Sequence, residues 1–168
     1  KNRKKFGNPV AVSLYPTPNK FAEFFSIFCY IYSMKLIGIA VVILYDDNKK
    51  ILMQQRGNDE KYYAGYWGCF GGHMENDETP KDALERELVE ELEYKVKNPV
   101  LLVTNEFIDG DSKIVTHNFI EKYDKSQQLV QHEGKGYGWF TVDDALKLKI
   151  TDLRRDTLLK ARNFLDEC

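Results

Sequence analysis

The part of the sequence best equipped for chemistry is GGHMENDETPKDALERELVEELEY, residues 71–94. It holds nine carboxylates and only two cations, Lys81 and Arg86. Like charges one helical turn apart repel each other by about 0.2–0.5 kcal/mol per pair, so this density of acid works against helix formation. Some local partner must offset that repulsion. The acids are Glu75, Asp77, Glu78, Asp82, Glu85, Glu87, Glu90, Glu91 and Glu93.

Three of these acids have the spacing of a cation site. Glu87, Glu90 and Glu91 stand at positions i, i+3 and i+4, so a helix brings their side chains to one face. That face borders the apolar stripe of the same helix, where unpaired anions are costly. Mg²⁺ would remove this cost, because it prefers carboxylate oxygens and keeps water for a phosphate partner. The alternative is a solvated acidic surface. The apolar stripe consists of Leu84, Leu88 and Leu92.

The same segment carries a family pattern. The box of the Nudix hydrolases reads G-x5-E-x7-R-E-U-x-E-E-x-G-U, where U is a bulky apolar residue. Gly72, Glu78 and the run from Arg86 to Tyr94 reproduce it, except that Glu93 stands where the pattern has glycine. That glycine ends the helix, so we expect Glu93 to affect the helix exit and not the chemistry. The chain resembles a MutT-like Nudix hydrolase over about residues 34–165.

The resemblance implies roles for residues that match the pattern. Arg86 would hold the box carboxylates by charge-assisted contacts, and Glu78 would support the geometry of loop and helix. In HEGKGYGWF, residues 132–140, Glu133 matches a loop glutamate of MutT-like proteins that reaches the metal site; an ordinary loop acid is the alternative. Glu87 and Glu133 are the two candidates for the general base. The implied ligands of Mg²⁺ or Mn²⁺ are the Gly71 carbonyl, Glu87, Glu90, Glu91 and Glu133.

The implied activity is hydrolysis of a nucleoside diphosphate linked to another moiety, with water attacking phosphorus. The substrate would be a nucleoside triphosphate or a related small nucleotide. Expected substrate contacts are Arg56, Tyr66, Trp67 and Gly72; a solvated arginine and packed loop aromatics are the alternatives. Asp152 is either a reader of the base edge or a helix cap. The lack of asparagine in KITDLRRDTLL, residues 149–159, weakens an oxidised-guanine assignment.

Two other functional classes stay open. An isopentenyl-diphosphate isomerase shares the fold and uses a catalytic cysteine, and Cys69 lies next to the expected metal loop. A non-catalytic nucleotide sensor of the same fold is the second alternative. The complete set of box carboxylates favours hydrolysis over both.

The elements that must position these groups can be read from the pattern of apolar residues. Strands are predicted at 36–45 and 51–56, joined as a hairpin by DDNKK, and a short extended piece at 69–74. A helix is predicted over 80–92, after polar capping residues at 76–79. Further strands are expected at 100–109, 113–123 and 136–140, a short helix capped by Thr141, and a helix at 152–165. This order predicts one α/β domain. The resemblance specifies a Nudix-type α/β/α sandwich with a mixed sheet and a catalytic loop–helix.

Composition limits the setting. The length of 168 residues favours one domain. The three cysteines are odd in number and widely spaced, which favours a reducing, cytoplasmic compartment. The net charge of −2 gives no strong field, so neither a nucleic-acid nor a membrane partner is expected. The resemblance implies a possible homodimer, because many relatives pair. Residues 34–168 are expected to form the Nudix domain. Residues 1–33 are interpreted as an N-terminal extension of unknown role, with a packed extra element as the alternative.

Overall fold

The computed structural model describes residues 34–167, so the interpretation of residues 1–33 lies outside it. The strands are β1 (Lys35–Tyr45), β2 (Ile51–Gln55), β3 (Trp67–Gly68), β4 (Phe70–His73), β5 (Val100–Asp109), β6 (Ser112–Lys122) and β7 (Gly136–Phe140). The helices are α2 (Pro80–Leu92), α3 (Val142–Ala145) and α4 (Asp152–Glu167). The predicted elements are all present, and most boundaries agree to within two residues.

Strand β1 is the centre of a seven-stranded mixed sheet. It pairs in parallel with β6 along its whole length, from Lys35↔Ser112 to Tyr45↔Lys122. On its other edge β4 pairs antiparallel with 39–42. The predicted hairpin of β1 and β2 is confirmed only at its turn, where Tyr45 pairs with Ile51. Beyond that pair β2 runs beside β7 and β3 instead.

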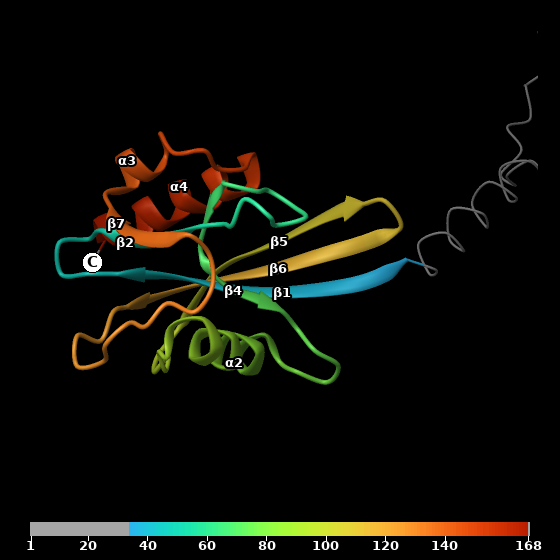
Figure 1. Ribbon diagram of the computed structural model, residues 1–168, viewed down its shortest axis with the longest axis horizontal. Coiled ribbons are helices and arrows are strands. Elements are labelled where there is room, and N and C mark those ends of the chain that lie inside the picture. Colours follow the sequence, from blue (N-terminus) through green and yellow to red (C-terminus); the bar gives the residue numbers. More distant parts are fainter. Residues whose placement is uncertain (1–33, 168) are drawn as a thin grey trace, which may run out of the picture. The chain divides into compact units, whose positions relative to one another are not determined.

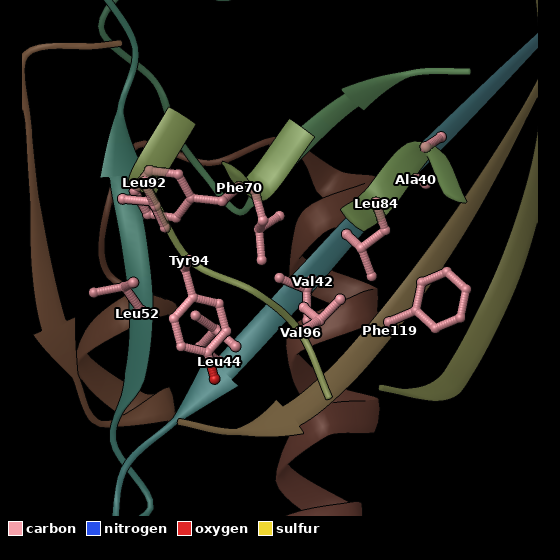
Figure 2. Close-up of a cluster of buried hydrophobic side chains, with 12 residues drawn as sticks. Ala40, Val42, Leu44, Leu52, Phe70, Leu84, Leu92, Tyr94, Val96 and Phe119 are labelled. Atoms are coloured by element: carbon pink, nitrogen blue, oxygen red, sulfur yellow. The ribbon is translucent and has the colours of Figure 1, made fainter. Parts of the chain in front are cut away.

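The sheet separates two apolar cores, as its alternating side chains require. From β1, Ala40, Val42 and Leu44 pack with the leucines of α2, while Val41 and Ile43 pack with α4. Figure 1 shows α2 on one side of the sheet and α3 with α4 on the other. Figure 2 shows how Phe70, Tyr94 and Phe119 fill the core beneath α2. The predicted α/β/α sandwich is therefore confirmed.

Helix α2 begins and ends where the sequence predicts. Thr79 caps it by accepting the Asp82 N–H, Asp82 reciprocates, and Pro80 occupies the first turn. All three leucines of the apolar stripe are fully buried. At the other end Glu93 adopts the left-handed conformation (φ 54°, ψ 25°) that the box glycine would take. The helix therefore ends at the position that the family pattern predicts, although the left-handed conformation is sterically unfavourable for Glu93.

Two details differ from the prediction. Trp67 and Gly68, expected to belong to a loop, form the short strand β3 against β2. Helix α4 is capped by Thr151, whose Oγ1 accepts the Arg154 N–H at 3.2 Å, so the capping role considered for Asp152 is wrong. Among the described helices, none has the length and apolarity needed to cross a bilayer.

Candidate active site

The paired glycines of β4 bring its backbone close to the carboxylates of α2. Gly71 has φ +117°, and a Cβ there would lie 2.3 Å from the Ala40 carbonyl oxygen. A Cβ on Gly72 would lie 2.5 Å from the carboxylate carbon of Glu87. The Gly71 N–H donates to Glu91 Oε2 at 2.8 Å. Only glycine at both positions leaves room for this approach.

Arg86 ties the loop before α2 to the helix. Its Nε and Nη2 donate to the two carboxylate oxygens of Glu78 at 2.8 and 3.0 Å. Nη1 donates to Glu87 Oε1 at 2.9 Å and to Glu90 Oε2 at 3.3 Å, and Nη2 also donates to the His73 carbonyl at 2.9 Å. This guanidinium holds the pKa of Glu78 at about 2, helped by the Glu75 N–H. One cation thereby fixes the orientation of three carboxylates.

Glu91 is the carboxylate least suited to carry a bare charge. It is buried, with 6% of its surface exposed. Burial raises its pKa from 4.5 to about 7, against the opposing hydrogen bonds from Gly71 and Gln54. The charges of Glu133 and Glu87 raise it further, which places all three carboxylates within electrostatic reach of one another.

A cleft of about 1020 Å³ opens over these carboxylates, a volume suited to a nucleotide-sized ligand. Of the residues predicted for the site, it brings together Arg56, Tyr66, Trp67, Gly71, Gly72, Glu87, Glu91 and Glu133. Three others do not line it: Arg86 and Glu78 lie behind the carboxylates, and the side chain of Glu90 is 58% exposed. The three acids at i, i+3 and i+4 therefore differ in exposure: Glu91 is buried, Glu87 is partly buried and Glu90 is exposed.

Another part of the cleft wall is formed by the segment before β3 and by Trp67. Arg56 pairs with Glu60 at 2.7 Å and donates to the Tyr62 carbonyl at 3.2 Å. The ammonium of Lys149 lies 4.3 Å from the ring centre of Tyr66. Trp67 packs edge-on against Phe140 in the core beneath α4. Arg56 and Tyr66 thus line the cleft while each contacts a charged residue, Glu60 and Lys149 respectively. Trp67 is held mainly by its packing in the core.

Gln54 and Arg154 are among the cleft residues that were not identified from sequence. Gln54 is buried on β2, and its amide lies 3.4 Å from the Cys69 carbonyl while it also hydrogen-bonds Glu91. Two polar residues in the otherwise apolar strand ILMQQ were the available signal. Arg154, at the start of α4, donates to the buried Asn118 Oδ1 at 3.1 Å and lines the cleft. Nothing local distinguishes it from an ordinary surface arginine.

Cys69 lies in the cleft wall but is poorly prepared for nucleophilic chemistry. Only 6% of its surface is exposed, and burial raises the pKa of its thiol, although Arg154 opposes this. The thiol therefore stays protonated at neutral pH, whereas a nucleophilic cysteine needs the thiolate.

Comparison with known proteins agrees with this geometry. A profile of the NUDIX domain matches residues 34–161. The chain belongs to the Nudix family. Its Nudix relatives include a CTP pyrophosphohydrolase of Escherichia coli (strain K12), 29% identical over 119 residues, which cover 68% of this chain and 82% of that protein. An 8-oxo-dGTP diphosphatase of Proteus vulgaris is 30% identical over 102 residues, 60% of this chain and 88% of that protein.

Solved structures with the same fold agree with this assignment. The Escherichia coli ORF135 protein superposes with a TM-score of 0.70 at 28% identity, covering 80% of this chain and 94% of that one. A MutT protein of Methanosarcina mazei Go1 superposes with a TM-score of 0.68 at 18% identity, covering 79% and 96%. The chain is thus a MutT-like Nudix protein, and its enzyme class is that of hydrolases acting on phosphorus-containing anhydrides.

Nudix hydrolases generally use divalent metal ions, and the donor set here suits one. Within residues 34–167 no three His, Cys, Asp or Glu side chains are already arranged as a metal cluster. Instead Arg86 holds Glu87 and Glu90, and the Gly71 N–H holds Glu91. The buried carboxylate of raised pKa and the glycine cradle beneath Glu87 nevertheless fit a hard cation with oxygen ligands.

Proposed function

We propose that this Nudix protein hydrolyses the pyrophosphate linkage of a nucleoside triphosphate, by attack of water at phosphorus and with Mg²⁺ or Mn²⁺ as cofactor. One observation carries the proposal: Glu87, Glu91 and Glu133 line a single cleft together with the paired glycines. A polyphosphate would be repelled by that much acid without a cation between them.

The cation would be held by the Gly71 carbonyl, Glu87, Glu90, Glu91 and Glu133. When bound, it neutralises charge on phosphate oxygens and makes water a better nucleophile at neutral pH. Glu90 joins this set only if its carboxylate exchanges Arg86 for the cation, because it accepts a hydrogen bond from Arg86 and does not line the cleft.

Residues of the chain itself supply the general base, position it and contact the phosphate. Glu87 is our first choice as the base that takes the proton of the attacking water, and Glu133 is the second. Arg86 positions Glu87 from behind, supported by Glu78. Arg56 meets a phosphate group after its guanidinium leaves Glu60, and Gly72 leaves room for substrate and carboxylate together.

The distal end of the cleft would select the base. Asp152 offers acceptors there, and Arg154 offers donors from a guanidinium fixed by Asn118. This pair complements a base edge with an amino donor and a carbonyl acceptor, as in cytosine and guanine. The two relatives named for CTP and 8-oxo-dGTP hydrolysis support that choice. Tyr66 would stack on the base, and Trp67 would support it from the core.

The test is a panel of nucleoside triphosphates, dinucleotides and nucleotide sugars, assayed with Mg²⁺, with Mn²⁺ and with a chelator. We expect a nucleoside monophosphate and pyrophosphate as products, and loss of turnover with the chelator. Glu87→Gln, Glu90→Gln and Glu91→Gln should each lower turnover by at least about 10²-fold. Glu85→Gln is the matched control, an exposed acid on the same helix. Metal-independent turnover, or a control as inactive as the three variants, would contradict the proposal.

A further inference from the structure

The segment that carries Glu133 is attached to the C-terminal end of α2. The Val130 N–H donates to the Leu92 carbonyl and the His132 N–H to the Glu91 carbonyl, both at 2.9 Å. These carbonyls belong to the last turn of the helix. Carbonyls there have no N–H partner within the helix, because no further helical turn follows. Glu133 therefore follows directly from a backbone anchored on the helix that supplies the other cleft carboxylates.

A side-chain contact reinforces the same attachment. Nε2 of His132 lies 2.8 Å from Oε1 of Glu93. Glu93 is the residue that stands in the position of the box glycine, in the left-handed conformation with φ 54°. Glycine would fit that backbone better but would have no side chain to reach His132. The departure from the family pattern thus coincides with a contact that only this departure makes possible.

The other end of the segment is fixed by β2. The Lys135 N–H donates to the Gln55 carbonyl at 2.8 Å. Gly134 has φ +79°, and a Cβ there would lie 2.8 Å from the same carbonyl oxygen. Glu133 therefore stands between two anchors, β2 on one side and the end of α2 on the other. The second anchor combines the two backbone bonds with the side-chain contact of Glu93 and His132, and Gln131 Nε2 also donates to the Glu133 carbonyl at 2.6 Å.

We infer that Glu93 and His132 form a clasp that positions Glu133 at the edge of the cleft. The two are positioning residues, because they act through Glu133 and do not line the cleft themselves. The inference deepens the proposed function and rests on it for the role of Glu133. The clasp itself is a property of the metal-free chain and can be measured without turnover.

The variants are Glu93→Gly, His132→Ala and the double variant, made in the full chain. Both residues are about half exposed, so we expect the His132 amide to exchange with solvent about three- to fivefold faster in each single variant. The double variant should match the single ones, because both remove the same contact. Global stability should be kept or raised in Glu93→Gly, since glycine tolerates the left-handed position. Glu85→Ala, elsewhere on α2, should leave the exchange of residues 130–135 unchanged.

Mn²⁺ binding and turnover provide the functional readouts. Affinity for Mn²⁺, titrated without nucleotide, and kcat should both fall about three- to fivefold in Glu93→Gly, while KM changes little. Glu93→Gln, which keeps an acceptor for His132, should recover most of both. Unchanged exchange and Mn²⁺ affinity in Glu93→Gly, or additive effects in the double variant, would overturn the clasp. Lack of turnover by wild-type protein would defeat the proposed function but leave the exchange result interpretable.

Discussion

Replacing the buried Glu91 by glutamine should stabilise the metal-free protein at neutral and alkaline pH. Burial raises the pKa of Glu91 from 4.5 to about 7. The folded protein therefore holds a proton on Glu91 in the pH range where the unfolded chain has lost it. The stability contributed by this group is fully present below pH 4.5 and is lost as the pH rises through about 7.

The size of the effect follows from the shift. One pKa unit corresponds to about 1.4 kcal/mol, so the ionised carboxylate costs the metal-free fold about 3 kcal/mol above neutral pH. Glu91→Gln keeps the size of the side chain and an oxygen for the Gly71 N–H but cannot ionise. We expect wild type and variant to be equally stable near pH 4.5. By about pH 8 the variant should unfold about 6–12 °C higher.

The assay is thermal and denaturant unfolding of both proteins across this pH range in the presence of a chelator. Glu85→Gln, with its side chain about half exposed, is the control and should show no pH-dependent difference from wild type. Saturating Mg²⁺ should then raise the Tm of wild type more than that of Glu91→Gln. A variant less stable than wild type at about pH 8 without metal would refute the reasoning, because the anion would then be stabilised by its surroundings.

Three further substitutions test the surrounding structure. Gly72→Ala should lower turnover by about 10²-fold with the fold retained, because the added Cβ displaces the carboxylate of Glu87, and steady-state kinetics with circular dichroism would show it. Arg86→Lys should lower turnover at least about tenfold and lower Tm, since an ammonium cannot grip Glu78 with two parallel bonds; normal kinetics would contradict this. Cys69→Ala should keep turnover within about twofold of wild type, and an inactive variant with intact fold would revive a cysteine-dependent reaction.

Local signals explain why α2 was predicted to the residue. The cap Thr79, the proline in the first turn and the leucine spacing all lie within the helix or next to it. The parallel pairing of β1 with β6 had no such signal, because the two strands lie far apart in the chain. The hairpin of β1 and β2 is limited to its turn because β4 occupies residues 39–42 on the same edge of β1. The sequence carried no signal for that pairing either.

The candidate site shows a similar division. The family resemblance predicted which groups gather near the glycines, Glu87 and Glu91 from the box and Glu133 from the segment 132–140, and all three do line one cleft. Spacing could not predict that Glu90 is exposed and bonded to Arg86 while Glu91 is buried, because i, i+3 and i+4 positions differ in how deeply the helix buries them. Arg154 was invisible for another reason: only the folded chain brings the start of α4 to the cleft. Nor did the pattern indicate that Glu93 would contact His132.

The cleft is lined by residues from both helical layers of the sandwich. Glu87 and Glu91 come from α2, and Asp152 and Arg154 come from the start of α4. Figure 1 shows these two helices on opposite sides of the sheet. Substitutions around Asp152 and Arg154 can accumulate without touching the contacts of Arg86. Reaction and selectivity are thus free to evolve at separate rates, and descendants of one ancestor could come to act on different nucleotides while inheriting the same machinery for breaking them.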